Sequence, residues 1–163
     1  MQIAPARSEL TLRPVTEGDR FRLRRWLSEP HVIRWWGSKS AAEAAVALAQ
    51  NSSSALVRII YKGDEPIGYA QAMDMDDRRL PPATWQADAF IGSMTHRGRG
   101  LGALALSQLR DEVFQTTLAA ALAVRIPVRN ERQVRAIERA GFRWRSVTSD
   151  PLLGPCWLLV AER

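Results

Sequence analysis

The sequence predicts a single domain of the α+β class, and three observations predict it. The chain has 163 residues with 46% hydrophobic content, which is enough for one well-packed core and short for two. Segments typical of strands and segments typical of helices both occur, and turn residues separate them. No internal repeat, domain linker or long low-complexity segment interrupts them, so we expect one domain over residues 10–163 behind a flexible leader at residues 1–9.

The first third of the chain predicts one strand and three helical segments. Apolar and polar residues alternate over residues 10–15, as in a short strand. Thr16 is a suitable N-cap for a helix that reaches about Ser28, because two acidic residues then lie in its first turn. Pro30 ends that helix. The other two helical segments are residues 31–37 and residues 41–50.

A β-hairpin and a further strand are expected in the middle of the chain. The arms of the hairpin are residues 55–61 and 66–73. Gly68 inside the second arm indicates a bulge or the close approach of another group. A polar, proline-broken loop follows, and its three acids are either solvated loop charge or a negative rim that attracts a cationic substrate. Residues 85–91 then form a strand.

The last third predicts two helices and three strands. A Leu/Ala-rich helix begins near Gly98 and runs to about Phe114. A second helix has a suitable N-cap in Asn130 and a glycine, Gly141, just past its end, so both of its boundaries can be predicted. The strands are expected within residues 118–126, 142–147 and 156–160.

Composition excludes several classes of protein. The net charge of +6 would suit a polyanion, but the excess is nearly all arginine, is spread along the chain and accompanies no nucleic-acid-binding motif. No stretch has the ~18–20 apolar residues of a membrane span, and residues 1–10 lack the apolar centre of a signal peptide. One cysteine, Cys156, and two histidines do not suggest a metal site. We expect a cytoplasmic protein that binds no nucleic acid, membrane or metal.

The chain is organised around a glycine-rich stretch that follows Phe90 and Ile91 and opens a helix. Gly98, Gly100 and Gly102 let backbone N–H groups approach a ligand closely, and the first turn of a helix leaves such donors unpaired. The helix dipole and neighbouring arginines favour negative charge there, so we expect a phosphate or pyrophosphate. The spacing fits neither a dinucleotide-binding fingerprint nor a nucleoside-triphosphate loop. A tight turn without a ligand is the alternative.

Asp88 is a carboxylate inside an otherwise apolar strand. Period-two geometry places it on the same face as Gln86 and Phe90. It is costly there unless it is paired or reaches a wet cleft, and a salt-bridged or surface position is the alternative. Trp35 and Trp36 either cap the core or form a flat wall that attracts a cation.

Several of these motifs resemble a known family. The order Arg97-x-x-Gly100-x-Gly102, followed by Asn130 and Ala140-Gly141-Phe142, resembles the two principal blocks of the GCN5-related N-acetyltransferases (GNAT). The similarity extends to the aminoglycoside 6′-N-acetyltransferase-like branch and covers most of residues 10–142. The blocks that resemble this branch are Trp26-Leu27, Trp35-Trp36-Gly37, Glu65-Pro-Ile-Gly-Tyr69-Ala-Gln71, Asp88-x-Phe90-Ile91-Gly92 and Gly98-x-Gly100-Leu-Gly102.

The resemblance implies the GNAT fold, with a mixed, mostly antiparallel central sheet of six to seven strands, flanked by about four helices and split at the fourth and fifth strands. It also implies an acyltransferase that uses acetyl-CoA as co-substrate, without a metal, to acetylate a primary amine, most directly the 6′-amine of an aminoglycoside, as antibiotic-resistance enzymes do. By this resemblance the cofactor-binding residues are Phe90, Ile91, Arg97, Gly98, Arg99, Gly100, Leu101, Gly102, Ala103 and Asn130.

Asp88 matches the carboxylate that this branch uses to bind and deprotonate the amine, so the resemblance makes it the catalytic residue. The role is chemically sensible, because a carboxylate can hold the ammonium form, position it and accept a proton directly or through water. The substrate-binding residues that the resemblance implies are Trp35, Trp36, Tyr69, Gln71 and Asp88.

Two positions depart from the family's pattern. Ile137 stands where many members have a tyrosine that protonates the leaving thiolate, which leaves the general acid to water or to Tyr69. Arg125-Ile126-Pro127 stands where the branch has Asp-Pro. The second change removes an acid that a polycationic aminoglycoside would use, and a basic protein steers such cations away.

Two other functions stay open from the sequence. One is a siderophore-building N-acyltransferase that acts on lysine or hydroxylysine, whose helix often has a start similar to Pro127-Val-Arg-Asn130-Glu131. The other is a catalytically silent acyl-CoA-binding domain, which the missing tyrosine permits. The expected binding partner is a small-molecule amine acceptor. The chain itself is expected to be a monomer or a homodimer.

Overall fold

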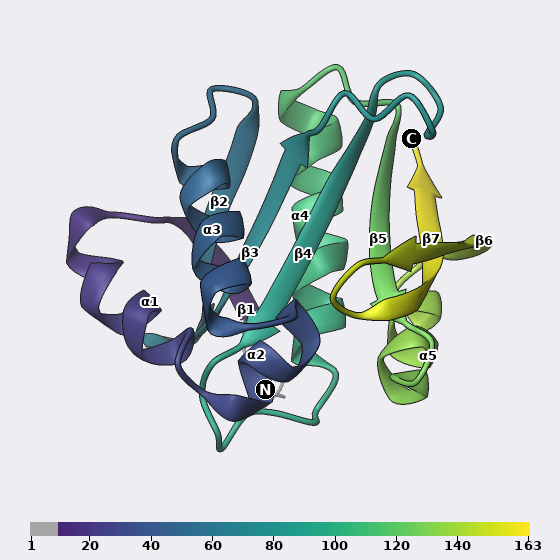
Figure 1. Ribbon diagram of the computed structural model, residues 1–163. Coiled ribbons are helices and arrows are strands. Elements are labelled where there is room, and N and C mark those ends of the chain that lie inside the picture. The colour runs from purple at the N-terminus through teal and green to yellow at the C-terminus, as the bar shows by residue number, and fades with distance from the viewer. Residues whose placement is uncertain (1–9) are drawn as a thin grey trace, which may run out of the picture.

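The computed structural model describes residues 10–163, so the expected leader at residues 1–9 lies outside the described part. Seven strands form one sheet in the order β1-β2-β3-β4-β5-β7-β6 (Figure 1), and only the β4–β5 pair is parallel. The predicted mixed, mostly antiparallel sheet of six to seven strands is therefore confirmed. The strands are β1 Leu10–Pro14, β2 Ala55–Lys62, β3 Glu65–Asp74, β4 Thr84–Ile91, β5 Ala121–Pro127, β6 Arg143–Asp150 and β7 Gly154–Glu162.

Helices cover both faces of the sheet (Figure 1). Among residues 10–163 there are five α-helices, as the segment-by-segment prediction with its break at Pro30 requires and one more than the about four that the resemblance implies. None of the helices in this described part is long and apolar enough to cross a membrane. The helical segments are the 3-10 turn η1 Glu17–Asp19, α1 Arg20–Trp26, α2 Pro30–Trp36, α3 Lys39–Gln50, α4 Leu101–Thr116 and α5 Glu131–Arg139.

The central strands are buried on both faces, since side chains alternate between two hydrophobic clusters. Ile59 and Ile60 are both 0% exposed, but Ile60 packs in the cluster that α4 and α5 cover, and Ile59 in the cluster that α1, α2 and α3 cover. Phe90 of β4 belongs to the second cluster and has edge contacts with Trp26 and Trp36. Because both faces of the sheet are covered by helices, a ligand must enter from an edge or from a gap between strands.

The boundaries of α4 and α5 follow their glycines. Gly98 and Gly100 have φ angles of +74° and +73°, which a regular helix cannot contain, so α4 begins at Leu101 instead of near Gly98. At the end of α5, Gly141 has a φ of +98° and the buried Phe142 follows it, as the sequence predicts. The late start of α4 leaves the glycine-rich stretch as an open loop ahead of the first turn.

Gly68 of β3 allows two strands to approach closely. A Cβ atom at this position would meet the carbonyl oxygen of Phe90 on the neighbouring strand β4. The pairing of β2 with β3 also shifts its register between Ile60 and Tyr61, opposite this part of β3. Both expectations for Gly68, a close approach and a nearby irregularity of the ladder, are met.

The β4–β5 pair opens into a gap. Its ladder consists of Thr84–Ala121, Trp85–Leu122 and Gln86–Ala123 and stops there. Figure 1 shows the two strands side by side at the top and separated toward the bottom of the view. The edges of the two strands that face each other below Gln86 therefore have no strand partner in the ladder, and the predicted split at the fourth and fifth strands is confirmed.

Candidate functional site

The gap between β4 and β5 widens into a cleft of about 820 Å³. Its lining comes from α2, from β4 and the loop that follows it, from the start of α4, from the end of β5 and from α5. The residues that line it are His31, Val32, Trp35, Trp36, Asp88, Ala89, Phe90, Ile91, Arg97, Gly98, Arg99, Gly100, Leu101, Gly102, Arg125, Ile126, Pro127, Asn130, Arg132, Gln133, Ala136 and Arg139.

One end of the cleft is built to hold an anion. Gly100 is the N-cap of α4, and the backbone N–H groups of the first helical turn have no partner within the helix. A Cβ atom at Gly100 would meet nothing within 4 Å, so the space beside this backbone is open. Arg97 and Arg99 flank the loop, and the guanidinium of Arg132 reaches toward Gly98 from α5. The dipole of α4 and three guanidiniums make this end of the cleft positive.

Nine of the ten residues predicted to bind the cofactor line this cleft, and Ala103 is the exception. Its side chain is 3% exposed and packs in the core cluster beneath α4. Only its backbone N–H, in the first turn of the helix, is placed to face a ligand. The role in binding of each of the ten stays a prediction.

The other end of the cleft holds two indoles. Trp36 packs edge-on against Phe90, with 5.4 Å between the ring centroids. Trp35 has the guanidinium of Arg34 4.7 Å from its ring centroid and that of Arg129 at 5.4 Å. The indoles thus have both roles that the sequence leaves open, since Trp36 packs on the core and both rings line the cleft.

Asp88 lies at the same end, on β4, and solvent reaches its side chain through the cleft. The protein around it raises the pKa of Asp88 to about 7, mainly because burial between the walls disfavours the charged form. The charge of Arg125 opposes this rise in pKa, and the charge of Asp150 adds to it. A carboxyl group with this pKa exchanges a proton readily near neutral pH.

Tyr69 and Gln71 lie on β3, next to the part of β4 that carries Asp88, but they do not line the cleft. Gln71 is the register partner of Asp88, and its side chain accepts a hydrogen bond of 2.9 Å from the hydroxyl of Tyr69. Tyr69 is 0% exposed and Gln71 is 7% exposed. Burial, and then the charge of Asp88, raise the pKa of Tyr69, which makes its hydroxyl a poorer acid. These two residues support β4 from within the core, and their contact with a substrate stays an untested prediction.

Ile137, at the position where the resemblance would place a tyrosine, lies in the core. It is 0% exposed and packs in the core cluster under α4 and α5. Within the part of the chain that the structure describes, no group of three or more His, Cys, Asp or Glu side chains is arranged to hold a metal ion.

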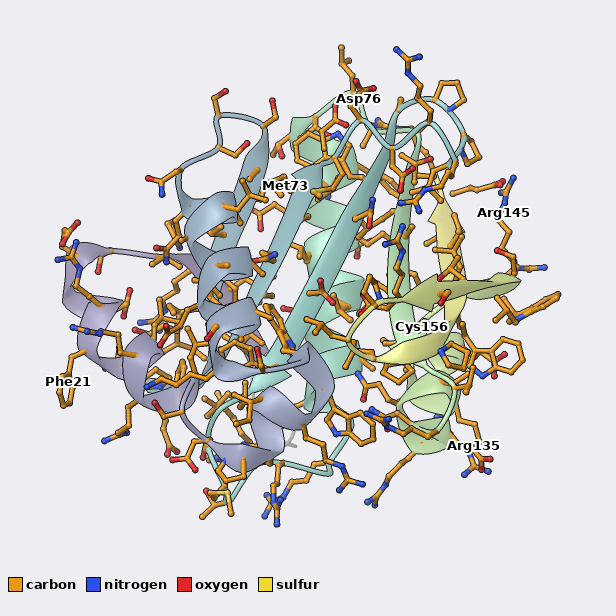
Figure 2. The ribbon with its side chains drawn as sticks, viewed as in Figure 1. Phe21, Met73, Asp76, Arg135, Arg145 and Cys156 are labelled. Atoms are coloured by element: carbon orange, nitrogen blue, oxygen red, sulfur yellow. The ribbon has the colours of Figure 1, made fainter. Side chains whose placement is uncertain are left out.

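Arg125 is the cleft residue whose role the sequence did not predict. Its Nη2 donates a hydrogen bond of 3.0 Å to Asp77, which also pairs with Arg79. Asp77 comes from the β3–β4 loop, which crosses the top of the molecule, where Figure 2 places Asp76. None of the three loop acids lines the cleft, so they do not form a negative rim there. Arg125 could have been found only from the register of the parallel strands, which places it level with Asp88.

His31 is a second residue that the sequence did not single out. Its Nε2 lies 2.9 Å from the backbone oxygen of Ile91, at the end of β4. The contact ties α2, which carries Trp35 and Trp36 into the lining of the cleft, to the end of the strand that carries Asp88.

Comparison with known proteins agrees with this geometry. The family model described as the acetyltransferase (GNAT) domain matches residues 16–148. The chain belongs to the GNAT acetyltransferase family. Membership makes it an acyltransferase of the N-acetyltransferase type and confirms the predicted family and enzyme class. An aminoglycoside N(6′)-acetyltransferase type 1 of Klebsiella pneumoniae is 27% identical over 177 residues, which cover 99% of this chain and 87% of that protein, and one of Serratia marcescens gives the same values.

Solved structures of other GNAT proteins share the whole fold. Aminoglycoside acetyltransferase AAC(6′)-Ib in complex with coenzyme A has a TM-score of 0.80 and 26% sequence identity over 95% of each chain. The same enzyme with ribostamycin and coenzyme A has a TM-score of 0.79. A spermidine N-acetyltransferase of Vibrio cholerae, at 14% identity and a TM-score of 0.75, is alike in fold. Coenzyme A is present in all three of these complexes, in agreement with the predicted co-substrate.

Proposed function

We propose that this GNAT protein transfers the acetyl group of acetyl-CoA to a primary amine that Asp88 binds and deprotonates. One observation carries the proposal: a single cleft has unpaired backbone donors at one end and a carboxylate with a pKa of about 7 at the other. The 6′-amine of an aminoglycoside is the first acceptor to test, because relatives that match nearly the full length of this chain are described as aminoglycoside 6′-N-acetyltransferases.

The cleft suits the shape and charge of acetyl-CoA. Its diphosphate would meet the open loop around Gly100 and the first turn of α4, with Arg97, Arg99 and Arg132 to balance the charge. The separated edges of β4 and β5 offer unpaired backbone groups to the amides of the pantetheine arm, in the way that an extra strand pairs with a sheet. The thioester supplies an activated acetyl group when it is bound.

Asp88 would act twice on the acceptor. An alkylammonium cannot attack a thioester, so the carboxylate first holds the cation and then takes its proton, directly or through water. The amine nitrogen forms a bond to the acetyl carbon while the carbon–sulfur bond breaks. Tyr69 is a poor candidate for the acid that protonates the leaving thiolate, because its hydroxyl is buried and donates to Gln71. We assign that proton to water in the open cleft.

The test is a thiol-release assay with acetyl-CoA and a panel of amines: aminoglycosides, polyamines, lysine and hydroxylysine. Release of coenzyme A with one of these amines, together with an acetylated product of the expected mass, supports the proposal. The silent acyl-CoA-binding domain predicts the opposite result, in which coenzyme A raises the melting temperature and no amine releases thiol.

A further inference from the structure

Asp88 and Arg125 face each other across the cleft from neighbouring strands. The parallel ladder ends at the pair Gln86–Ala123, and Asp88 and Arg125 each follow two positions later on their strands. Because side chains alternate along a strand, both point to the same face of the sheet. Arg125 lowers the pKa of Asp88 through its charge, yet no ion pair joins these two described residues. The strands have separated at this point, so the two groups stand apart with the cleft between them.

Arg125 has N–H donors that no described residue accepts. Its Nη2 is held by Asp77 at 3.0 Å, whereas its Nε is buried and has no partner among the described residues. A guanidinium carries five N–H donors in a fixed, planar arrangement that matches the two oxygens of a carboxylate. The side chain of Arg125 is 29% exposed and lines the cleft, so its accessible N–H groups, and not the buried Nε, can meet an acceptor oxygen there. Asp77 holds the guanidinium in place, and the accessible N–H groups that it does not bind are left for a ligand.

The diphosphate of the coenzyme is not placed to accept hydrogen bonds from these unpaired N–H groups of Arg125. The unpaired amides that suit a diphosphate belong to α4, which packs on the opposite face of the sheet. Arg125 shares its face with Asp88 and with Phe90, whose ring packs among α1 and α2. Arg125 is thus placed at the acceptor end of the cleft.

The lining of the acceptor end carries little negative charge for a polycation, although Asp150 lies near enough behind it to act on Asp88. Among the described residues that line the cleft, Asp88 is the only carboxylate. Arg34 and Arg129 lie against the ring of Trp35 just outside the lining, and Arg125 stands opposite Asp88. A ligand with several ammonium groups would satisfy one of them at Asp88 and bring the others close to guanidiniums.

We propose that the preferred acceptor is a primary amine that also carries a carboxylate, with its ammonium held by Asp88 and its carboxylate by Arg125. This inference rests on the proposed N-acetyltransferase function and narrows its acceptor. A lysine-derived acceptor belongs to this class. An aminoglycoside, which has several amines and no carboxylate, does not.

The test compares amines that differ only in the carboxylate. The kcat/KM of acetylation is measured for a series of ω-amino acids and for the alkylamines of equal chain length, since chain length sets the distance between the two charged groups. We expect the ω-amino acid to be preferred by roughly 10- to 100-fold at the best length, as for a charge-assisted hydrogen-bonded pair. Arg125→Gln should bring this ratio to about one.

Two control variants separate a binding role of Arg125 from a structural one. Arg79→Gln removes the other arginine that pairs with Asp77, is largely exposed and lies outside the cleft lining, so it should leave the ratio unchanged. Asp77→Asn loosens the β3–β4 loop but keeps the charge of Arg125. If Arg125 only anchors this loop, Asp77→Asn and Arg125→Gln will change the ratio equally.

The outcomes distinguish the two proposals. If amines are acetylated but the carboxylate brings no preference at any length, or if Arg125→Gln keeps the preference, the carboxylate subsite is wrong and the proposed function stands. If no amine is acetylated, the proposed function fails. The subsite is then judged by calorimetric titration of ω-amino acids into the protein saturated with coenzyme A. Binding that Arg125→Gln abolishes supports the subsite, and absence of binding to the unmodified protein overturns it.

Discussion

The two ends of the cleft are built in different ways. At the coenzyme end, the binding groups are backbone amides, and the glycines at 98 and 100 hold φ angles of +74° and +73° that expose them. At the acceptor end, the groups are side chains from α2, β4 and β5, which lie far apart in the sequence. The comparison teaches that a backbone site is encoded within a few consecutive residues, whereas a side-chain site depends on which strands become neighbours.

If the ends are independent, damage to the acceptor end will stop turnover and leave coenzyme binding intact. We expect Asp88→Asn to lower kcat/KM for the amine by about 10²- to 10⁴-fold, the usual range for the loss of a general base. The amide keeps the size of the side chain but neither attracts an ammonium nor accepts its proton. Steady-state kinetics of thiol release measures the loss.

Calorimetric titration with coenzyme A is the control for this variant, and its Kd should stay within about twofold of the unmodified protein. Near-normal turnover of Asp88→Asn would remove Asp88 from the mechanism. A large loss of coenzyme A affinity would show instead that the two ends are coupled.

The reverse experiment damages the backbone site. Gly100→Ala should weaken coenzyme A binding by roughly 5- to 30-fold, because its Cβ enters the open space beside the loop where the diphosphate is expected. The strain of about 1–2 kcal/mol at a φ of +73° is present with and without the ligand, so it lowers stability and not affinity. Gly63→Ala is a matched control, since Gly63 also has a positive φ and open space around it but lies in the β2–β3 turn. Both variants should lose similar thermal stability. Equal coenzyme A affinities for the two would contradict the proposed role of the loop.

The pH dependence of turnover sharpens the assignment of the acceptor end. Asp88 must be ionised to accept a proton, and its pKa is about 7, so kcat/KM should rise about tenfold between pH 6 and pH 8. Arg125 and Asp150 are the charged groups that act on it, in opposite directions. Asp88→Asn should lose this rise, and any rise that persists in the variant belongs to the amine substrate.

The smallest expected effect is on stability. A carboxyl whose pKa is higher in the folded than in the unfolded state stabilises the fold only while it is protonated, so its contribution is lost as the pH rises through about 7. At pH 8 Asp88→Asn should therefore melt at a higher temperature than the unmodified protein, and the difference should shrink as the pH falls through 7 and vanish near pH 4, where the carboxyl is protonated in the unfolded state as well. Because solvent in the cleft screens the charge, we expect a rise of about 1–3 °C by calorimetry. A lower melting temperature at pH 8 would mean that the charge stabilises the fold.

Most of the fold could be predicted because its signals are local. The turn at Gly63, the break at Pro30 and the glycine at 141 each fix a boundary within a few residues. The sequence predicts the start of α4 too early, near Gly98 and not at Leu101, since leucine and alanine content alone cannot reveal that Gly98 and Gly100 adopt left-handed φ angles. The split of the sheet followed from the family resemblance and not from periodicity.

Less of the acceptor end could be predicted. Asp88 and the indoles stood out as residue types in unusual places, and the structure brings them into one cleft. Tyr69 belongs to a motif that resembles the family's, but period two alone could not tell that Phe90 stacks on its ring and that α1–α3 cover it, so that it does not line the cleft. The pairing of Arg125 with Asp77 joins residues 48 positions apart and has no local signal.

The short β4–β5 ladder affects how fast individual backbone N–H groups exchange their hydrogen with solvent. Beyond Gln86 and Ala123 each strand keeps one bonded neighbour, β3 on one side and β7 on the other, so successive N–H groups alternate between a ladder and the cleft. Deuterium uptake along these segments should therefore alternate between fast and slow residues in the free protein. Once a thioester fills the gap, the fast set should slow as well, and the alternation should fade.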